Sequence, residues 1–355
     1  MDFRSTLLDF KKEIDPQIEE FFDGEIEDIR EKDDFSAEIV SYIKKLVLSG
    51  GKRIRPALVF NGYKAFGGKE KEKIMKIAIA TELIHIFLLI HDDIIDRGEK
   101  RHGVDVLNKW VEKKSEAEFK DDDSMRYGNS VAIIAGDMAF ALANKLVAKS
   151  GFSENLLVEV FAYLQKIVLS TCIGQNQDIN IEYSDMAKKT EVMKMYENKT
   201  ARYTFEGPLR LGAILAGAGR KDFDSISKYA IPIGVAFQIQ DDILGIFGDE
   251  EKIGKSAASD IIEGKKSILV LSAMENGNEA EKEKINFLLG KKDISENEIA
   301  EFRAIIKKSG ALESAKDEMK KLIEKGKSSS DEIGTDKEVH VFLSSMGDYM
   351  LSREL

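Results

Sequence analysis

The sequence has few of the features that mark secreted, membrane-spanning or nucleic-acid-binding proteins. Its single cysteine, Cys172, excludes an internal disulfide framework and is typical of a reducing cytoplasm. The net charge of −11 at pH 7 and the lack of a basic stripe argue against nucleic-acid binding. The apolar run at 86–90 is far too short to cross a bilayer, and the start Met1–Arg4 is not typical of a signal peptide. We therefore expect a soluble cytoplasmic protein without stable membrane insertion.

Proline is also scarce, with four residues in 355, and this leaves long stretches in which a helix can continue. These stretches are rich in Ala, Leu, Ile, Glu and Lys, so the fold class is predicted as all-α. No linker or constant repeat divides the chain, which predicts one domain over 1–355. Cys172 falls in an apolar helix and is expected to be a small core residue. The predicted helices include 7–13, 17–31, 36–48, 71–95, 130–147, 156–183 and 222–247.

Two local patterns predict where helices are interrupted. Asp15-Pro16 is expected to separate the first two helices, because proline favours the first helical position. The segment 112–126 is almost entirely charged and is expected to be an exposed loop or frayed helix with little of the core in it.

An acidic motif, His91-Asp92-Asp93-Ile94-Ile95-Asp96, follows the apolar run at 86–90. On a helix, Asp92 and Asp96 share one face and repel each other, so the helix gains from them only if a cation lies between. A hard divalent ion is the natural candidate. In a chain this acidic such a triad is expected about twice by chance and usually marks a solvated face. The preceding apolar run places this one at the edge of the core or in a cleft.

Several cations accompany glycines in patterns that suit anions. Ser49-Gly50-Gly51 ends a predicted helix, and Lys52-Arg53-Ile54-Arg55 opens the next. Backbone N–H groups and the helix dipole both favour an anion there, although a basic surface turn is the plainer alternative. Asp241-Asp242 forms a second acidic pair, and a glycine-punctuated loop follows at 254–266. A site that gathers carboxylates and cations fits a ligand with many anionic oxygens, best a diphosphate. The cations are Lys52, Arg55, Arg101, Lys199, Lys255 and Lys265.

Five ordered motifs together resemble the trans-isoprenyl diphosphate synthases, most closely the archaeal-type short-chain geranylgeranyl diphosphate synthases. The resemblance covers nearly the whole chain. It implies a single all-α domain, usually a homodimer, with helices around a deep central cavity in which the two acidic motifs face each other. The motifs are Gly50–Pro56, Glu82–His85, His91–Asp96, Lys199-Thr200 and Phe237–Asp242.

The resemblance also implies a role for each residue. Mg²⁺ would be held by Asp92, Asp96 and Asp241. Three ions would be present when substrate is bound, and Mn²⁺ is an alternative metal. The allylic diphosphate would be bound by Arg101, Lys199, Lys255 and Lys265, with the oxygens of Thr200 and Gln238 aimed at the carbocation. The diphosphate of isopentenyl diphosphate would be bound by Lys52, Arg55, His85 and His102. Without the resemblance, His85 would be interpreted as a core histidine, and Thr200 and Gln238 as ordinary polar groups of helices.

Three positions depart from the family pattern or bear on the product. His102 stands where the family usually has a second arginine, so one contact to isopentenyl diphosphate becomes a weaker, pH-dependent donor. Gly245 stands where the second acidic motif commonly has a third aspartate. An aromatic residue five places before Asp92, Phe87, together with Leu88 at the fourth place resembles enzymes that make the C20 product.

The sequence alone leaves other activities open. Farnesyl diphosphate synthases usually carry aromatic residues at both chain-length positions. A terpene cyclase shares the first acidic motif but does not need a second diphosphate site, so Lys52, Arg55 and His85 argue against it. A noncatalytic helical subunit of a hetero-oligomeric prenyltransferase is conceivable because of Gly245 and His102.

Overall fold

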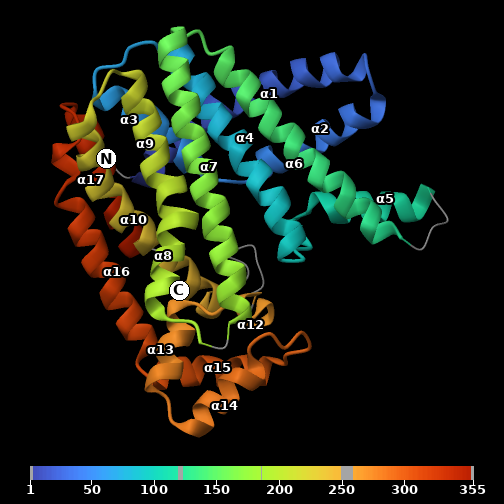
Figure 1. Cartoon of the computed structure of the whole chain (residues 1–355), viewed down its shortest axis with the longest axis vertical. Helices are drawn as coiled ribbons and strands as arrows, with labels where there is room; N and C mark the ends of the chain where they lie inside the picture. Colours follow the sequence, from blue (N-terminus) through green and yellow to red (C-terminus); the bar gives the residue numbers. More distant parts are fainter. Residues whose placement is uncertain (1–2, 119–122, 185, 249–258, 353–355) are drawn as a thin grey trace. The chain divides into compact units, whose positions relative to one another are not determined.

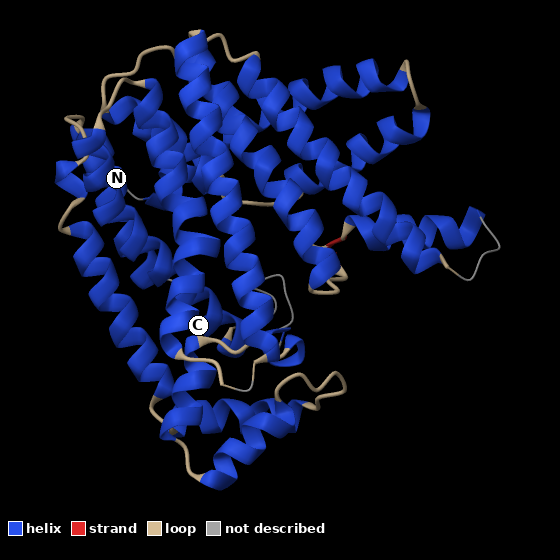
Figure 2. Ribbon diagram, viewed as in Figure 1, coloured by secondary structure: helices blue, strands red, loops and turns tan. Residues whose placement is uncertain are grey.

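The computed structural model describes residues 3–118, 123–184, 186–248 and 259–352, and nearly all of these are helical (Figures 1 and 2). The prediction of an all-α fold is confirmed. In the described ranges the strands form one short antiparallel hairpin, β1 (Lys100–Arg101) with β2 (Val104–Asp105). The helices fold into two compact units. The N-terminal unit is Asp2–Asn61 with Gly68–Val158, and the C-terminal unit is Gly62–Gly67 with Glu159–Leu355.

The N-terminal unit is organised around α4, which runs from Lys71 to Ile95 as predicted. Two-thirds of its most apolar 18-residue window is buried. It lies along α6 (Ser124–Ala148) in Figure 1, and α5 (Leu107–Glu118) packs on α6 in turn. The helices of this unit are α1 (Phe3–Arg30), α2 (Asp34–Leu48), most of α3 (Ile54–Ala65), α4, α5 (Leu107–Glu118) and α6 (Ser124–Ala148).

The predicted break at Asp15-Pro16 is wrong, because α1 continues through Pro16. An interior proline removes a hydrogen bond and costs about 3 kcal/mol or more. Ile14, Ile18 and Phe22 are fully buried along one stripe on both sides of it. Burying each such side chain contributes about 1.5–3 kcal/mol. The packing of the stripe therefore outweighs the local cost.

The charged segment 112–126 is also more regular than expected. Helix α5 extends to Glu118, and Ser115 within it is buried. Its charges are paired, with Lys109 Nζ 2.8 Å from Glu112 Oε2 and Lys113 Nζ 2.7 Å from Asp105 Oδ2. Of the two predicted alternatives, the structure has helix rather than loop, in α5 up to residue 118 and in α6 from Ser124, while residues 119–122 lie outside the described part.

The C-terminal unit is built on α10 (Arg220–Phe247), which packs against a π-helix, Glu197–Glu206, and against α16, Ala311–Lys327 (Figure 1). The other helices are α7 (Glu154–Tyr183, in this unit from Glu159), α8 (Lys189–Tyr196), α9 (Gly207–Leu215), α12 (Ser259–Glu263), α13 (Ile268–Asn276), α14 (Glu279–Leu288), α15 (Glu296–Lys308), α16 (Ala311–Lys327), a 3-10 turn (Ser330–Glu332) and α17 (Lys337–Ser352).

Two glycines let the neighbouring helices approach the backbone of the π-helix. A Cβ on Gly174 of α7 would lie 2.3 Å from Lys199 N, and one on Gly234 of α10 would lie 2.4 Å from Ala201 Cα. Hydrogen bonds of the i→i+5 type are rare and frequently occur at functional sites. The close approach on both sides fixes Lys199 and Thr200 relative to α7 and α10.

Four described helices are long and apolar enough to span a membrane, namely α4, α6, α7 and α10. The run at 86–90 is only a part of the apolar stretch of α4. The most apolar window of α7 is only 28% buried, against 67% in α10. Cys172 lies on α7 and is exposed, so its predicted place in the core is wrong. An apolar helix predicts burial only when another element covers that face, and nearby Leu169 and Ile173 are also exposed.

Candidate active site

In the N-terminal unit, the glycine turn, His85 and the Arg101-His102 pair form one cluster. A Cβ on Gly50 would lie 2.4 Å from Cγ of His102, so this glycine makes room for the ring. Burial and the charges of Arg55, Arg101, Arg53 and His102 lower the pKa of His85 well below 6.5. His85 is therefore a neutral imidazole at pH 7, surrounded by cations that favour an anion.

Arg53 does not belong to the anion-binding group that the sequence predicts at this turn. The residue is 3% exposed, and its side chain donates through Nε to Asp15 at 2.7 Å, through Nη1 to Glu82 at 3.0 Å and through Nη2 to Val47 O at 2.8 Å. These three acceptors hold the turn onto α1, α2 and α4. Lys52 is exposed and Arg55 is partly exposed, so these two remain the candidates at this turn.

The first acidic motif contains two kinds of aspartate. Asp96 is the C-cap of α4, and its N–H donates to Asp92 O at 2.8 Å, which keeps the two residues on one helix face as predicted. Asp93 is 7% exposed and accepts from Arg101, with Nη2 2.6 Å from Oδ1 and Nε 3.2 Å from Oδ2. Burial opposes the charge of Arg101, but these bonds and the charges of Asp93, Asp92 and Asp96 raise its pKa. Arg101 thus lies beside the carboxylates.

The donors of this motif fit a magnesium ion that a substrate helps to bind. Within the described ranges no three His, Cys, Asp or Glu side chains are grouped closely enough to hold a metal alone. Magnesium usually takes only one or two protein carboxylates and completes its octahedron with phosphate and water. Asp92 and Asp96, both partly exposed, supply such a pair of oxygen donors.

In the C-terminal unit, the predicted residues of the π-helix and α10 lie together. Lys199 Nζ is 2.7 Å from Asp178 Oδ2 of α7, and Thr200 Oγ1 donates to Gln238 Oε1 at 2.6 Å. The structure therefore places Thr200 and Gln238 in direct contact. Asp241 is partly exposed on α10.

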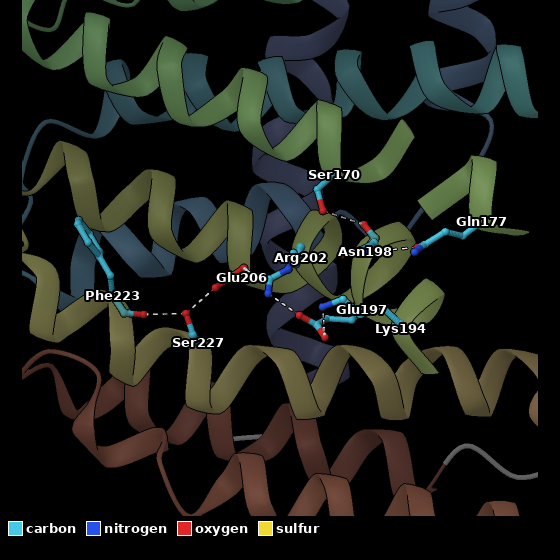
Figure 3. A network of polar contacts seen from close by, with 9 residues as sticks. All are labelled: Ser170, Gln177, Lys194, Glu197, Asn198, Arg202, Glu206, Phe223 and Ser227. Atoms are coloured by element: carbon cyan, nitrogen blue, oxygen red, sulfur yellow. Dashed lines mark hydrogen bonds and ion pairs between the residues drawn. The ribbon is translucent and has the colours of Figure 1, made fainter. Parts of the chain in front are cut away.

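A network of polar contacts anchors the π-helix on both sides (Figure 3). Asn198 Nδ2 donates to Gln177 Oε1 at 3.0 Å, which ties it to α7. Arg202 forms ion pairs with Glu197 and Glu206, and Ser227 of α10 donates to Glu206. These contacts restrain the two turns that carry Lys199 and Thr200.

Asp260 is a candidate that the sequence did not single out. A Cβ on Gly245 would lie 2.1 Å from Oδ2 of Asp260, so this carboxylate fills the space beside Gly245. The third carboxylate near the second acidic motif thus comes from α12. The only signal in the sequence is an aspartate in the glycine-punctuated loop, and the approach to Gly245 requires the tertiary fold.

Lys265 lies next to this group, with Nζ 2.7 Å from Glu263 Oε2 and 3.9 Å from Asp260 Oδ1. Lys255 lies outside the described residues, as does the whole stretch 254–258 of its predicted loop, whereas residues 259–263 form α12. Of the chain-length residues, the Phe87 ring is 5.0 Å from the rings of both His91 and Phe140, and Leu88 is partly exposed.

Comparison with known proteins identifies the family of this chain. A polyprenyl synthetase family model matches residues 36–306. A short chain isoprenyl diphosphate synthase of Methanocaldococcus jannaschii is 33% identical, covering 86% of this chain and 85% of that protein. A geranylfarnesyl diphosphate synthase of Aeropyrum pernix is 32% identical, covering 87% and 92%.

A solved structure is similar over the full length. It is a geranylgeranyl pyrophosphate synthase from Corynebacterium glutamicum, complexed with isoprenyl diphosphate and magnesium. The TM-score is 0.92 at 30% identity, and all of both chains is covered. The chain therefore belongs to the polyprenyl synthetase family of prenyltransferases.

Proposed function

We propose that the protein is a short-chain trans-prenyltransferase that condenses isopentenyl diphosphate with dimethylallyl, geranyl or farnesyl diphosphate to give geranylgeranyl diphosphate. The observation that carries this proposal is the coexistence of a neutral His85 among cations with the Asp92–Asp96 pair, within a chain of this family. A diphosphate site without a metal and a diphosphate site with one are what a two-substrate condensation needs.

On the allylic side, the bond from C1 to oxygen breaks and diphosphate leaves with the electron pair. Arg101, Lys199 and Lys265, with Lys255, would bind the negative oxygens that develop, in the manner of preorganised electrostatic catalysis. The Mg²⁺ ions would be held by Asp92, Asp96 and Asp241, with Asp260 beside Gly245. Three ions would bind in all, and Mn²⁺ could replace Mg²⁺. When bound, these ions stabilise the leaving diphosphate as Lewis acids.

On the other side, Lys52, Arg55 and His102 would bind the diphosphate of isopentenyl diphosphate. His85, being neutral, would donate one N–H without adding charge. The π electrons of the double bond form the new carbon–carbon bond to C1, and a proton is then lost to the released diphosphate. Thr200 and Gln238 would direct their oxygens at the allylic cation, since Thr200 donates its own proton to Gln238 and keeps lone pairs for the cation.

The proposed product has 20 carbons because Phe87 stands at the fifth position before Asp92 and a solved relative is a geranylgeranyl synthase. The Aeropyrum relative makes a 25-carbon product the second candidate. We also propose a homodimer, which the exposed apolar residues of α7 support, and a cytoplasmic enzyme, which its lone cysteine supports.

The direct test is to incubate the purified protein with Mg²⁺, isopentenyl diphosphate and each allylic primer, and to measure product length by chromatography. We expect a C20 product with every primer, no product in excess chelator, and none from Asp92→Asn combined with Asp96→Asn. Failure to extend any primer would favour a noncatalytic subunit. Release of a cyclic hydrocarbon from the allylic substrate alone would show a cyclase instead.

A further inference from the structure

Asp242, the second aspartate of the second acidic motif, is buried within a set of hydrogen bonds. It is 5% exposed, and Oδ1 accepts from Gln238 Nε2 at 3.0 Å. Oδ2 accepts from the hydroxyl of Tyr196, which is 2% exposed. The same hydroxyl oxygen accepts the N–H of Ile268, the first residue of α13, at 3.0 Å.

These bonds determine which end of the Gln238 amide faces Thr200. A glutamine amide can be turned over, which exchanges its oxygen and nitrogen. Because Asp242 Oδ1 takes the Nε2 donor, Oε1 must face Thr200, and it accepts from Oγ1 at 2.6 Å. Burial and the charge of Asp260 raise the pKa of Asp242 to about 8. Gln238 Nε2 bonds to Oδ1 and the Tyr196 hydroxyl bonds to Oδ2, so the orientation of the Gln238 amide follows from these two bonds.

We propose that Asp242 is a positioning residue, held by Tyr196, that aims the oxygens of Gln238 and Thr200 at the allylic cation rather than binding metal. The proposal rests on the proposed roles of Gln238 and Thr200. It separates the two aspartates of the motif, since Asp241 is partly exposed whereas Asp242 has both oxygens engaged. Tyr196 also links this alignment to the start of α13 through Ile268.

The test compares Tyr196→Phe, Asp242→Ala and Asp242→Asn with Asp241→Asn. We expect kcat to fall by up to roughly a hundredfold in Tyr196→Phe and Asp242→Ala, which a misplacement of about 1 Å can cost. KM for both substrates and the Mg²⁺ concentration for half-maximal activity should stay within about twofold. Asp242→Asn keeps an acceptor for Gln238 and should recover most of the lost rate. Asp241→Asn should instead raise the Mg²⁺ requirement.

A second measurement reports directly how well the oxygens of Gln238 and Thr200 are aimed at the allylic cation. A misdirected cation is captured by water, which forms a C–O bond, loses a proton and yields the prenyl alcohol. The ratio of alcohol to condensation product should therefore rise in Tyr196→Phe. Tyr229→Phe is the matched control, because Tyr229 is also fully buried and its hydroxyl donates to Leu343 O at 2.8 Å. It should leave the rate and the ratio unchanged.

The outcomes separate this inference from the proposed function. A wild-type protein that forms no prenyl product contradicts the proposed function. An active wild type whose Tyr196→Phe variant keeps its rate and alcohol ratio contradicts only the role of Tyr196 and Asp242. A rise in the Mg²⁺ requirement of Asp242→Asn equal to that of Asp241→Asn would show that Asp242 is a metal ligand. Circular dichroism and thermal unfolding confirm that each variant is folded.

Discussion

At the scale of single residues, the second aspartate of each acidic pair is the buried one. Asp93 bonds Arg101, and Asp242 bonds Gln238 and Tyr196. Ordered and specific motifs predicted both pairs and the cations, and the roles of these residues stay predictions. The sequence could not show which carboxylate of a pair is hydrogen-bonded within the protein, nor that Arg53 is bonded to Asp15 and Glu82. These assignments depend on partners distant in the chain.

Gly245 allows a prediction that runs against the family pattern. Restoring the aspartate, Gly245→Asp, is expected to lower activity, because its Cβ would displace the carboxylate of Asp260 2.1 Å away. Steady-state rates at several Mg²⁺ concentrations measure the effect. The unfolding temperature should change little, since the short side chain of Asp260 can rotate away.

The matched variants for Gly245 are Gly245→Ala and the double change Gly245→Asp with Asp260→Gly. Alanine should lower activity as well, because the displacement needs only a Cβ. The double variant moves the carboxylate to position 245 and should recover part of the rate. Higher activity in Gly245→Asp alone would contradict the role given to Asp260.

Phe87 is expected to limit the length of the product. Its ring is held by contacts to His91 and Phe140, so Phe87→Ala removes a fixed obstacle and should shift the main product beyond C20. Chromatography of the dephosphorylated products gives the chain length. Leu88→Ala serves for comparison and should shift the product length less. An unchanged distribution in Phe87→Ala would rule out this residue as the stop.

At the scale of elements, local sequence predicted α4 to the residue but not the course of α1 or the π-helix. Helix α4 is apolar around its circumference and is flanked by the polar residues Glu70 and Asp96, which are strong local signals. Helix α1 continues through Pro16 because of a buried stripe, and the π-helix depends on glycines in two other helices. Packing of this kind cannot be predicted from the sequence of the segment itself.

The glycine contacts of the π-helix give a stability prediction. Gly174→Ala would place a Cβ 2.3 Å from the backbone of Lys199, and overpacking of this kind typically costs about 1–3 kcal/mol. Gly24→Ala is the control, because Gly24 lies in α1 with nothing near its Cβ and should gain about 0.4–1 kcal/mol. Urea unfolding measures both. Equal stability of Gly174→Ala and the wild type would contradict the packing argument.

At the scale of the whole molecule, the exposed apolar residues of α7 predict self-association. Leu169→Glu should convert a dimer to a monomer, measured by light scattering after size exclusion, because a carboxylate would be buried in the interface. Phe287→Glu on α14 is the control, since Phe287 is 62% exposed, the same as Leu169. A wild type that is monomeric at micromolar concentration would contradict the prediction.

Cys172 lies on this same helix, three residues from Leu169, and is the one cysteine of the chain. A thiol reagent can therefore attach a single spin label or dye to the native protein without any engineered cysteine. Partial burial raises the pKa of this thiol above 9.0, so alkylation should be run under alkaline conditions. Its labelling rate, slow in an assembled enzyme and fast after dilution, would follow subunit exchange in real time.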